Sequence, residues 1–170
     1  MKRHLLFAAL LLSQAFPAWA AIEAGSPAPE FVSERLGGSP GGAGRLSMRD
    51  LQGKVVYLDF WASWCAPCRA SFPRLDALYA RLRDRGFEVV AVNKDQEAAE
   101  AAKFLATFPV SFPILTDGDN QLAVSYGVKA MPSAYLIDRK GNIRFMHRGF
   151  NSDSLASIEL QVQQLLGEEQ

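Results

Sequence analysis

The chain has 170 residues, with 18 Lys and Arg against 18 Asp and Glu, so its formal net charge is zero. The length and composition are those of one ordinary globular domain. The balanced charge, with no basic patch, gives no indication of nucleic-acid binding.

The first twenty residues have the three parts of an export signal. Residues 1–4 form a basic n-region, residues 5–12 form an apolar core, and residues 18–20 (Ala-Trp-Ala) form a small-x-small cleavage site. We expect cleavage after Ala20, which leaves residues 21–170 as one domain in the periplasm. The alternative is an uncleaved membrane anchor, but the apolar core is short for a span of about 20 residues.

A segment that contains two prolines and a glycine-rich loop follow the signal in turn. Residues 24–31 (Ala-Gly-Ser-Pro-Ala-Pro-Glu-Phe) indicate extended chain. Residues 37–44, mostly glycine, predict a flexible loop, which we interpret as a hairpin tip between residues 31–36 and 45–48. A nucleotide-binding glycine loop is the alternative, but the loop lacks the Lys-Ser/Thr ending and the following helix that such a site needs.

The two cysteines of the chain lie where a strand is predicted to turn into a helix. Residues 55–60 are a β-branched and aromatic run that predicts a buried strand. After a short turn, helical spacing of apolar residues predicts an amphipathic helix that contains Phe72, Leu75, Leu78 and Leu82. Cys65 and Cys68 therefore fall at the helix N-terminus.

This position indicates redox chemistry. Unpaired backbone N–H groups and the positive end of the helix dipole favour a thiolate at Cys65, and Cys68 is close enough to close a disulfide with it. A four-ligand zinc site would need two more Cys or His nearby, and the chain has only His4 and His147 besides. A purely structural bridge across so tight a loop would remove little unfolded-state entropy. We therefore expect a redox-active pair with no metal and no cofactor.

Residues 59–68, Asp-Phe-Trp-Ala-Ser-Trp-Cys-Ala-Pro-Cys, resemble the TlpA/ResA branch of the thioredoxin superfamily. The resemblance implies an extracytoplasmic thiol-disulfide oxidoreductase. It also implies a thioredoxin-like three-layer α/β fold with an N-terminal β-hairpin and an inserted helix. Cys65 would be the nucleophile, and Cys68 would resolve the mixed disulfide.

The resemblance also implies a role for Asp59, the acid in the predicted strand. In thioredoxins a buried acid at this place exchanges protons with the resolving thiol. A charge in an apolar strand is costly unless it is paired, hydrated or neutralised by a raised pKa, and a strand residue turned to a polar partner is the alternative. Thioredoxins pair the acid with a lysine in the next strand, but residues 88–93 contain none and Lys94 follows only at the strand's end.

The rest of the chain predicts further strands and helices. Residues 87–93 indicate a strand parallel to the first, because a helix connects the two. A helix over residues 96–108, with Ala98, Ala101, Ala102, Leu105 and Phe108 on its apolar face, resembles the helical insertion of the TlpA branch. The remaining predictions are a strand at 112–117, a helix at 120–126, a hairpin of 135–137 with 142–147, and a helix at 152–166 with Leu155, Ile158, Val162 and Leu165 on one face.

A second active-site segment surrounds Met131 and Pro132. It resembles the thioredoxin segment in which a cis-proline precedes a strand, and the resemblance implies a cis bond facing Cys65. The backbone there would bind an incoming peptide as a strand pairs with a sheet edge. We expect Trp64 to line the same substrate surface and Trp61 to lie in the core.

The resemblance implies a monomeric reductant that acts on protein thiols and disulfides and receives electrons from a membrane donor. The Ala-Pro dipeptide between the cysteines lacks the histidine that helps oxidants to stabilise their reduced form. A disulfide oxidant or isomerase is one alternative, because an oxidising compartment keeps disulfides oxidised. A Sco-like copper metallochaperone is another, but it needs three residues between its cysteines and a histidine placed differently from His147. Ser133 stands where cytochrome-dedicated relatives often carry glutamate, which favours a less dedicated substrate.

Overall fold

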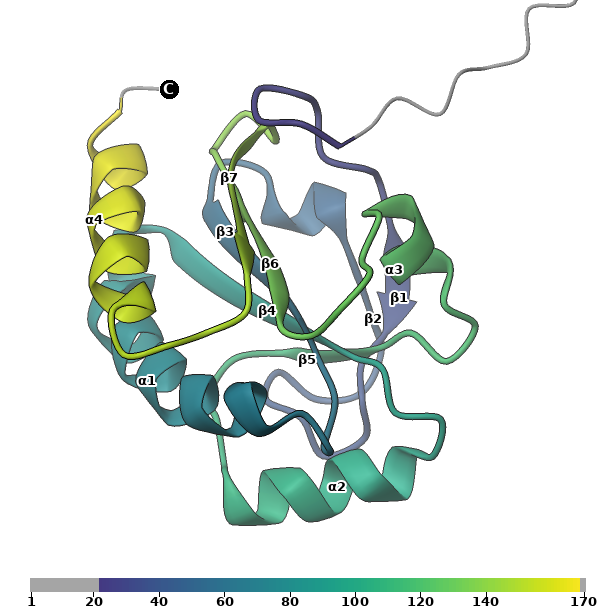
Figure 1. The fold of residues 1–170 in the computed structure, drawn as a ribbon. Helices are drawn as coiled ribbons and strands as arrows, with labels where there is room; N and C mark the ends of the chain where they lie inside the picture. The colour runs from purple at the N-terminus through teal and green to yellow at the C-terminus, as the bar shows by residue number, and fades with distance from the viewer. Residues whose placement is uncertain (1–21, 169–170) are drawn as a thin grey trace, which may run out of the picture.

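The computed structural model describes residues 22–168 as a sheet with helices on both faces and a small hairpin beside it (Figure 1). The export signal predicted at residues 1–20 lies outside the described residues. No helix within residues 22–168 has the length and apolar character needed to cross a membrane.

Seven strands and four α-helices make up the described chain, with two short 3-10 helices. In order they are β1 (Val32–Glu34), β2 (Arg45–Ser47), a 3-10 helix (Met48–Leu51), β3 (Val55–Trp61), α1 (Ala66–Leu82), a 3-10 helix (Arg83–Arg85), β4 (Phe87–Asn93), α2 (Ala98–Thr107), β5 (Ile114–Thr116), α3 (Gln121–Ser125), β6 (Ser133–Ile137), β7 (Ile143–Arg148) and α4 (Ser154–Gly167).

The main sheet has the strand order β5-β4-β3-β6-β7, so β3 lies at its centre. β3 and β4 run parallel, as predicted from the helix between them, and β5 continues the parallel side. β6 and β7 add an antiparallel hairpin on the other side. β1 and β2 pair separately, which confirms the hairpin predicted around the glycine-rich loop. The fold is the predicted thioredoxin-like α/β arrangement.

Every residue of β3, β4 and β6 is buried, because helices or the hairpin cover both faces of the sheet. One face packs against α1, α2 and α4, and the other packs against the hairpin and α3. Successive residues of a strand point to opposite faces. Tyr57 and Trp61 pack in the same cluster as α1, so Asp59 between them faces α1 as well.

The end of α1 and the start of α4 have local causes, and α4 starts two residues after the predicted residue 152. α1 gives way at Leu82 to a 3-10 turn, and Gly86 closes it with a φ of 92°, a left-handed conformation that favours glycine. α4 begins at Ser154 because the Asn151 side chain accepts hydrogen bonds from the backbone N–H groups of Asp153 and Ser154.

α2 packs differently from the prediction. The helix begins at Ala98, and Ala98 and Ala102 are exposed, so the alanine-rich face was only partly right. Ala101 and Phe104 are the buried residues of this helix. The Phe104 ring centroid lies 4.8 Å from that of Trp61 and 5.1 Å from that of Phe72. A phenyl ring buries far more apolar surface than a methyl group, so the aromatic contact determines how the helix sits.

We predict that Phe104→Ala lowers the free energy of unfolding by about 3–5 kcal/mol, because it leaves a cavity against two aromatic rings. Ala106→Gly, at an exposed position of the same helix, should cost only about 1 kcal/mol. Urea unfolding of both variants measures the difference. Equal losses would show that α2 is held by its backbone propensity and not by this contact.

Candidate active site

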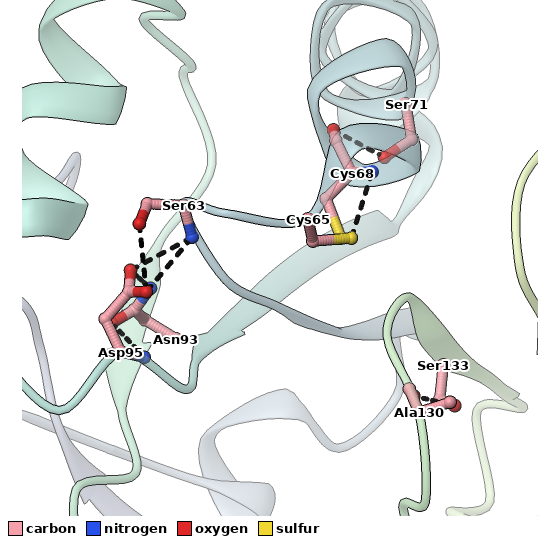
Figure 2. Close-up of a disulfide and its surroundings, with 8 residues drawn as sticks. All are labelled: Ser63, Cys65, Cys68, Ser71, Asn93, Asp95, Ala130 and Ser133. Carbon is pink, nitrogen blue, oxygen red and sulfur yellow. Dashed lines mark hydrogen bonds between the residues drawn. A yellow bond between two sulfur atoms is a disulfide. The ribbon is translucent and has the colours of Figure 1, made fainter.

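Cys65 and Cys68 form a disulfide at the start of α1 (Figure 2). Cys65 is the N-cap residue of the helix, and the Cys68 backbone N–H donates to the Cys65 Sγ at 3.2 Å. Pro67 lies in the first turn, where a backbone N–H has no helical partner in any case. Cys65 retains 3% exposure and Cys68 none. Cys65 is therefore the less buried of the two residues, and its sulfur is also the one that receives the helix N–H.

A buried carboxylate holds the turn that leads into Cys65. The Ser63 N–H donates to both Asp95 oxygens, at 3.2 and 3.1 Å, and the Ser63 hydroxyl donates to Oδ1 at 3.0 Å. The Asn93 side-chain amide donates to Asp95 Oδ2 at 2.8 Å (Figure 2). Sequence reasoning missed Asp95. Its signal was a polar run directly after β4, because the carboxyl ends of neighbouring parallel strands lie at one edge of the sheet.

The Met131–Pro132 peptide bond is cis, as predicted. The Pro132 carbonyl accepts the Gly149 N–H at 2.8 Å, and the Ser133 hydroxyl donates to the Ala130 carbonyl at 2.7 Å. Ser133 pairs in register with Phe60, near the end of β3, which brings the loop to the same end of the sheet as the disulfide. Figure 2 shows the loop among the surroundings of the disulfide.

Asp59 lies in the middle of the sheet and is 2% exposed. Its neighbours in register are Ala91 on β4 and Ala134 on β6. Its Oδ2 atom has no hydrogen-bond partner among the described residues. Burial raises the pKa of Asp59 to about 8, because an ionised carboxylate loses its hydration there. The acid is therefore mostly protonated at neutral pH.

Lys94 does not contact Asp59. Its ammonium group donates to the Asp117 carboxylate at 2.7 Å and to the Asp117 carbonyl at 2.8 Å, and it also binds the Asn120 side chain. The position directly across from Asp59 on β4 belongs to Ala91. The structure thus confirms that the strand beside Asp59 carries no lysine.

The two tryptophans near the cysteines lie in different environments. Trp61 is fully buried, with its ring centroid 4.6 Å from that of Phe72. Trp64 is 68% exposed, one residue before Cys65. His147, for which the sequence suggested no role, lies partly buried on β7, where its Nε2 is 2.8 Å from the Gln161 side-chain oxygen.

A groove of about 360 Å³ lies beside the cis-proline loop. Its lining is mainly apolar, with two lysines, and consists of Lys94, Asn120, Ala123, Val124, Val128, Lys129, Ala130 and Met131. A larger cavity of about 460 Å³ lies between β1 and α3, but it is lined by neither cysteine nor by Pro132. Within residues 22–168 no three His, Cys, Asp or Glu side chains are grouped so as to hold a metal ion.

Comparison with known proteins identifies the family. The model of the Redoxin family matches residues 23–162. The thiol-disulfide oxidoreductase ResA of Bacillus subtilis is 34% identical over 134 residues, which are 79% of this chain and 72% of the relative. ResA of Geobacillus thermodenitrificans is 36% identical over 143 residues, 82% of this chain and 79% of the relative.

A solved structure extends the likeness to three dimensions. A crystal structure from Chlorobium tepidum, assigned as a thiol:disulfide interchange protein DsbE, superposes with a TM-score of 0.80 at 42% identity. The match covers 86% of this chain and 100% of that chain. The chain therefore belongs to the Redoxin family, among its ResA-like thiol-disulfide oxidoreductases.

Proposed function

We propose that the protein is exported and reduces disulfide bonds of other proteins, with the Cys65–Cys68 pair as its electron donor. The observation that carries this proposal is the disulfide at the N-terminus of α1, at the same end of the sheet as the cis-proline loop. Export is supported by the basic, apolar and small-x-small parts of residues 1–20.

The reaction proceeds through a mixed disulfide. The Cys65 thiolate attacks one sulfur of the substrate disulfide, so that a new S–S bond forms as the substrate bond breaks, and the released substrate sulfur takes up a proton. The Cys68 thiolate then attacks the Cys65 sulfur, and the second substrate thiol leaves. The Cys68 N–H and the helix N-terminus favour the Cys65 thiolate.

The ionised fraction of Asp59, which is the minor form at neutral pH, serves as the base that removes the Cys68 proton before the second attack. Its pKa of about 8 lies close to the ordinary value of a cysteine thiol, about 8.5. Proton transfer between groups of similar pKa needs little driving force in either direction. The same burial that makes the carboxylate costly therefore makes it a suitable proton carrier for a buried thiol.

The substrate peptide binds along Trp64, Met131 and Pro132. The exposed Trp64 ring provides an apolar surface beside Cys65, and the backbone at Met131 pairs with the peptide as a sheet edge does. The groove beside Met131 accommodates apolar side chains of the substrate. The protein works as a monomer on protein substrates and needs no cofactor.

The direction of electron flow follows from what surrounds the thiolate. Residues 66–67 (Ala-Pro) place no histidine between the cysteines, so the reduced form receives little extra stabilisation and the couple gives up electrons readily. An oxidising compartment would otherwise keep the pair oxidised. The two electrons that regenerate the dithiol come from a membrane-bound thiol donor.

We predict that Cys68→Ser accumulates a mixed disulfide with a disulfide-containing peptide, whereas Cys65→Ser does not. In the first variant the nucleophile can attack but nothing resolves the product. Mass spectrometry of the protein after mixing measures the adduct. An adduct that forms on Cys68 in the Cys65→Ser variant, and not in the other, would reverse the two roles.

We also predict that Asp59→Asn alters how the stability of the oxidised protein depends on pH. The pKa of Asp59 rises from its ordinary 3.8 to about 8 on folding, so the native state holds a proton that the unfolded chain releases. The free energy of unfolding of the unmodified protein should therefore fall as pH rises from about 4 to about 8. Asn carries no such proton, so the variant should gain relative stability over that range.

Urea unfolding of both proteins between pH 4 and pH 9 measures this difference. Parallel pH profiles would mean that Asp59 is ionised in the folded protein at neutral pH, and its role as a matched base would then be wrong.

A further inference from the structure

Asp59 and His147 lie in one row across the sheet. Asp59 on β3 pairs in register with Ala134 on β6, and Ala134 pairs with His147 on β7. Residues that pair in register project to the same face, so both side chains face the layer of α1 and α4. Strands lie about 4.8 Å apart, which places the two backbones roughly 10 Å apart with Ala134 between them in the row.

The hydrogen bond of His147 determines its tautomer. Its Nε2 lies 2.8 Å from the Oε1 atom of Gln161 on α4, and an amide oxygen can only accept. Gln161 donates its amide to the Ser157 hydroxyl at 3.4 Å, which is consistent with the oxygen facing the imidazole. Nε2 therefore carries the hydrogen, and Nδ1 is a free acceptor. That Nδ1 is buried and has no partner among the described residues.

Asp59 presents the complementary group. With a pKa of about 8 it is a carboxylic acid at neutral pH, and its buried Oδ2 has no partner among the described residues. A donor without an acceptor and an acceptor without a donor thus lie on the same face of the sheet. Buried polar groups are rarely left unpaired, because each one costs the free energy of its lost hydration.

The groups around this pair come from every neighbouring element. Tyr57 on β3 is a further titratable side chain. Its ring centroid lies 5.7 Å from that of His147, and burial raises its pKa, with a smaller contribution from the charge of Asp59. Ala91 and Ala134 flank Asp59, and Gln161 is the polar contact from α4. Cys68, in its disulfide with Cys65, is the sulfur residue that α1 adds to this cluster. Burial lowers the pKa of His147, and no charged side chain contributes to that shift.

We propose that His147 is a positioning residue for Asp59, whose protonated carboxyl group donates a hydrogen bond to Nδ1 through one water molecule above Ala134. The proposal rests on the proposed role of Asp59 as the base for Cys68. A bridging water needs two to four polar partners, of which Asp59 and His147 supply two.

The test is an NMR pH titration of His147 in the oxidised full chain, with His147→Gln to identify its signal. A hydrogen bond from the acid stabilises the neutral imidazole, so Asp59→Ala should raise the pKa of His147 by roughly 0.5 to 1 pH unit, the equivalent of one hydrogen bond. Asp59→Asn retains an N–H donor and should leave that pKa near its original value. This readout involves no thiol exchange, so its failure would leave the proposed disulfide reductase activity standing.

Glu88→Gln is the matched control. Glu88 is also buried with one unpartnered oxygen, but it lies in a different row of the sheet: it pairs in register with Val56, three residues before Asp59, and its other oxygen accepts from Lys54. This control should leave the pKa of His147 unchanged. An unchanged pKa in Asp59→Ala, equal shifts in the Ala and Asn variants, or an equal shift in Glu88→Gln would each overturn the proposal.

Discussion

The site depends on two parallel strands, β3 and β4, that end side by side. Trp61 pairs in register with Asn93, and the Lys94 N–H donates to the Trp61 carbonyl at 2.9 Å, so both chains leave the sheet together. Two residues later the Asp95 carboxylate binds Ser63 and fixes the turn. The N-terminus of α1, and Cys65 with it, is thereby fixed relative to the sheet. The helix contributes its unpaired N–H groups only because this turn aims them at the sulfur.

Asp59 on the central strand β3 destabilises the folded protein when it ionises, and it also serves the proposed proton transfer. An acid buried between two alanines, with no cation beside it, destabilises the folded protein at any pH at which it ionises. The small size of Ala91 and Ala134 leaves the carboxyl group without a tightly packed apolar neighbour in its own row. Burial alone then adjusts the pKa toward that of a thiol, where a lysine partner would have lowered it. Proton handling in this chain thus rests on desolvation and not on an ion pair.

Local patterns predicted most of the fold. The run at residues 55–60 and the helical spacing after it fixed β3 and α1, and the family resemblance identified the cis bond before Pro132. The lack of a lysine beside Asp59 was also visible in the sequence. Contacts between distant segments were not. Phe104 packs against Trp61, and Asp95 binds Ser63. His147 is placed by the register of β6 and β7. None of these pairings produces a periodic pattern in the sequence. The alanine-rich pattern of α2 misled for the same reason, since one aromatic contact outweighs several methyl groups.

The reduction potential of the Cys65–Cys68 couple tests the central claim most directly. The protein is equilibrated with glutathione buffers of known redox potential and then alkylated. Mass analysis gives the fraction of oxidised protein at each buffer potential. A reductant with no histidine between its cysteines should have a potential closer to thioredoxin, at about −270 mV, than to DsbA, at about −120 mV. A potential above roughly −180 mV, the value typical of protein disulfide isomerase, would make the protein an isomerase or an oxidant and would contradict the account.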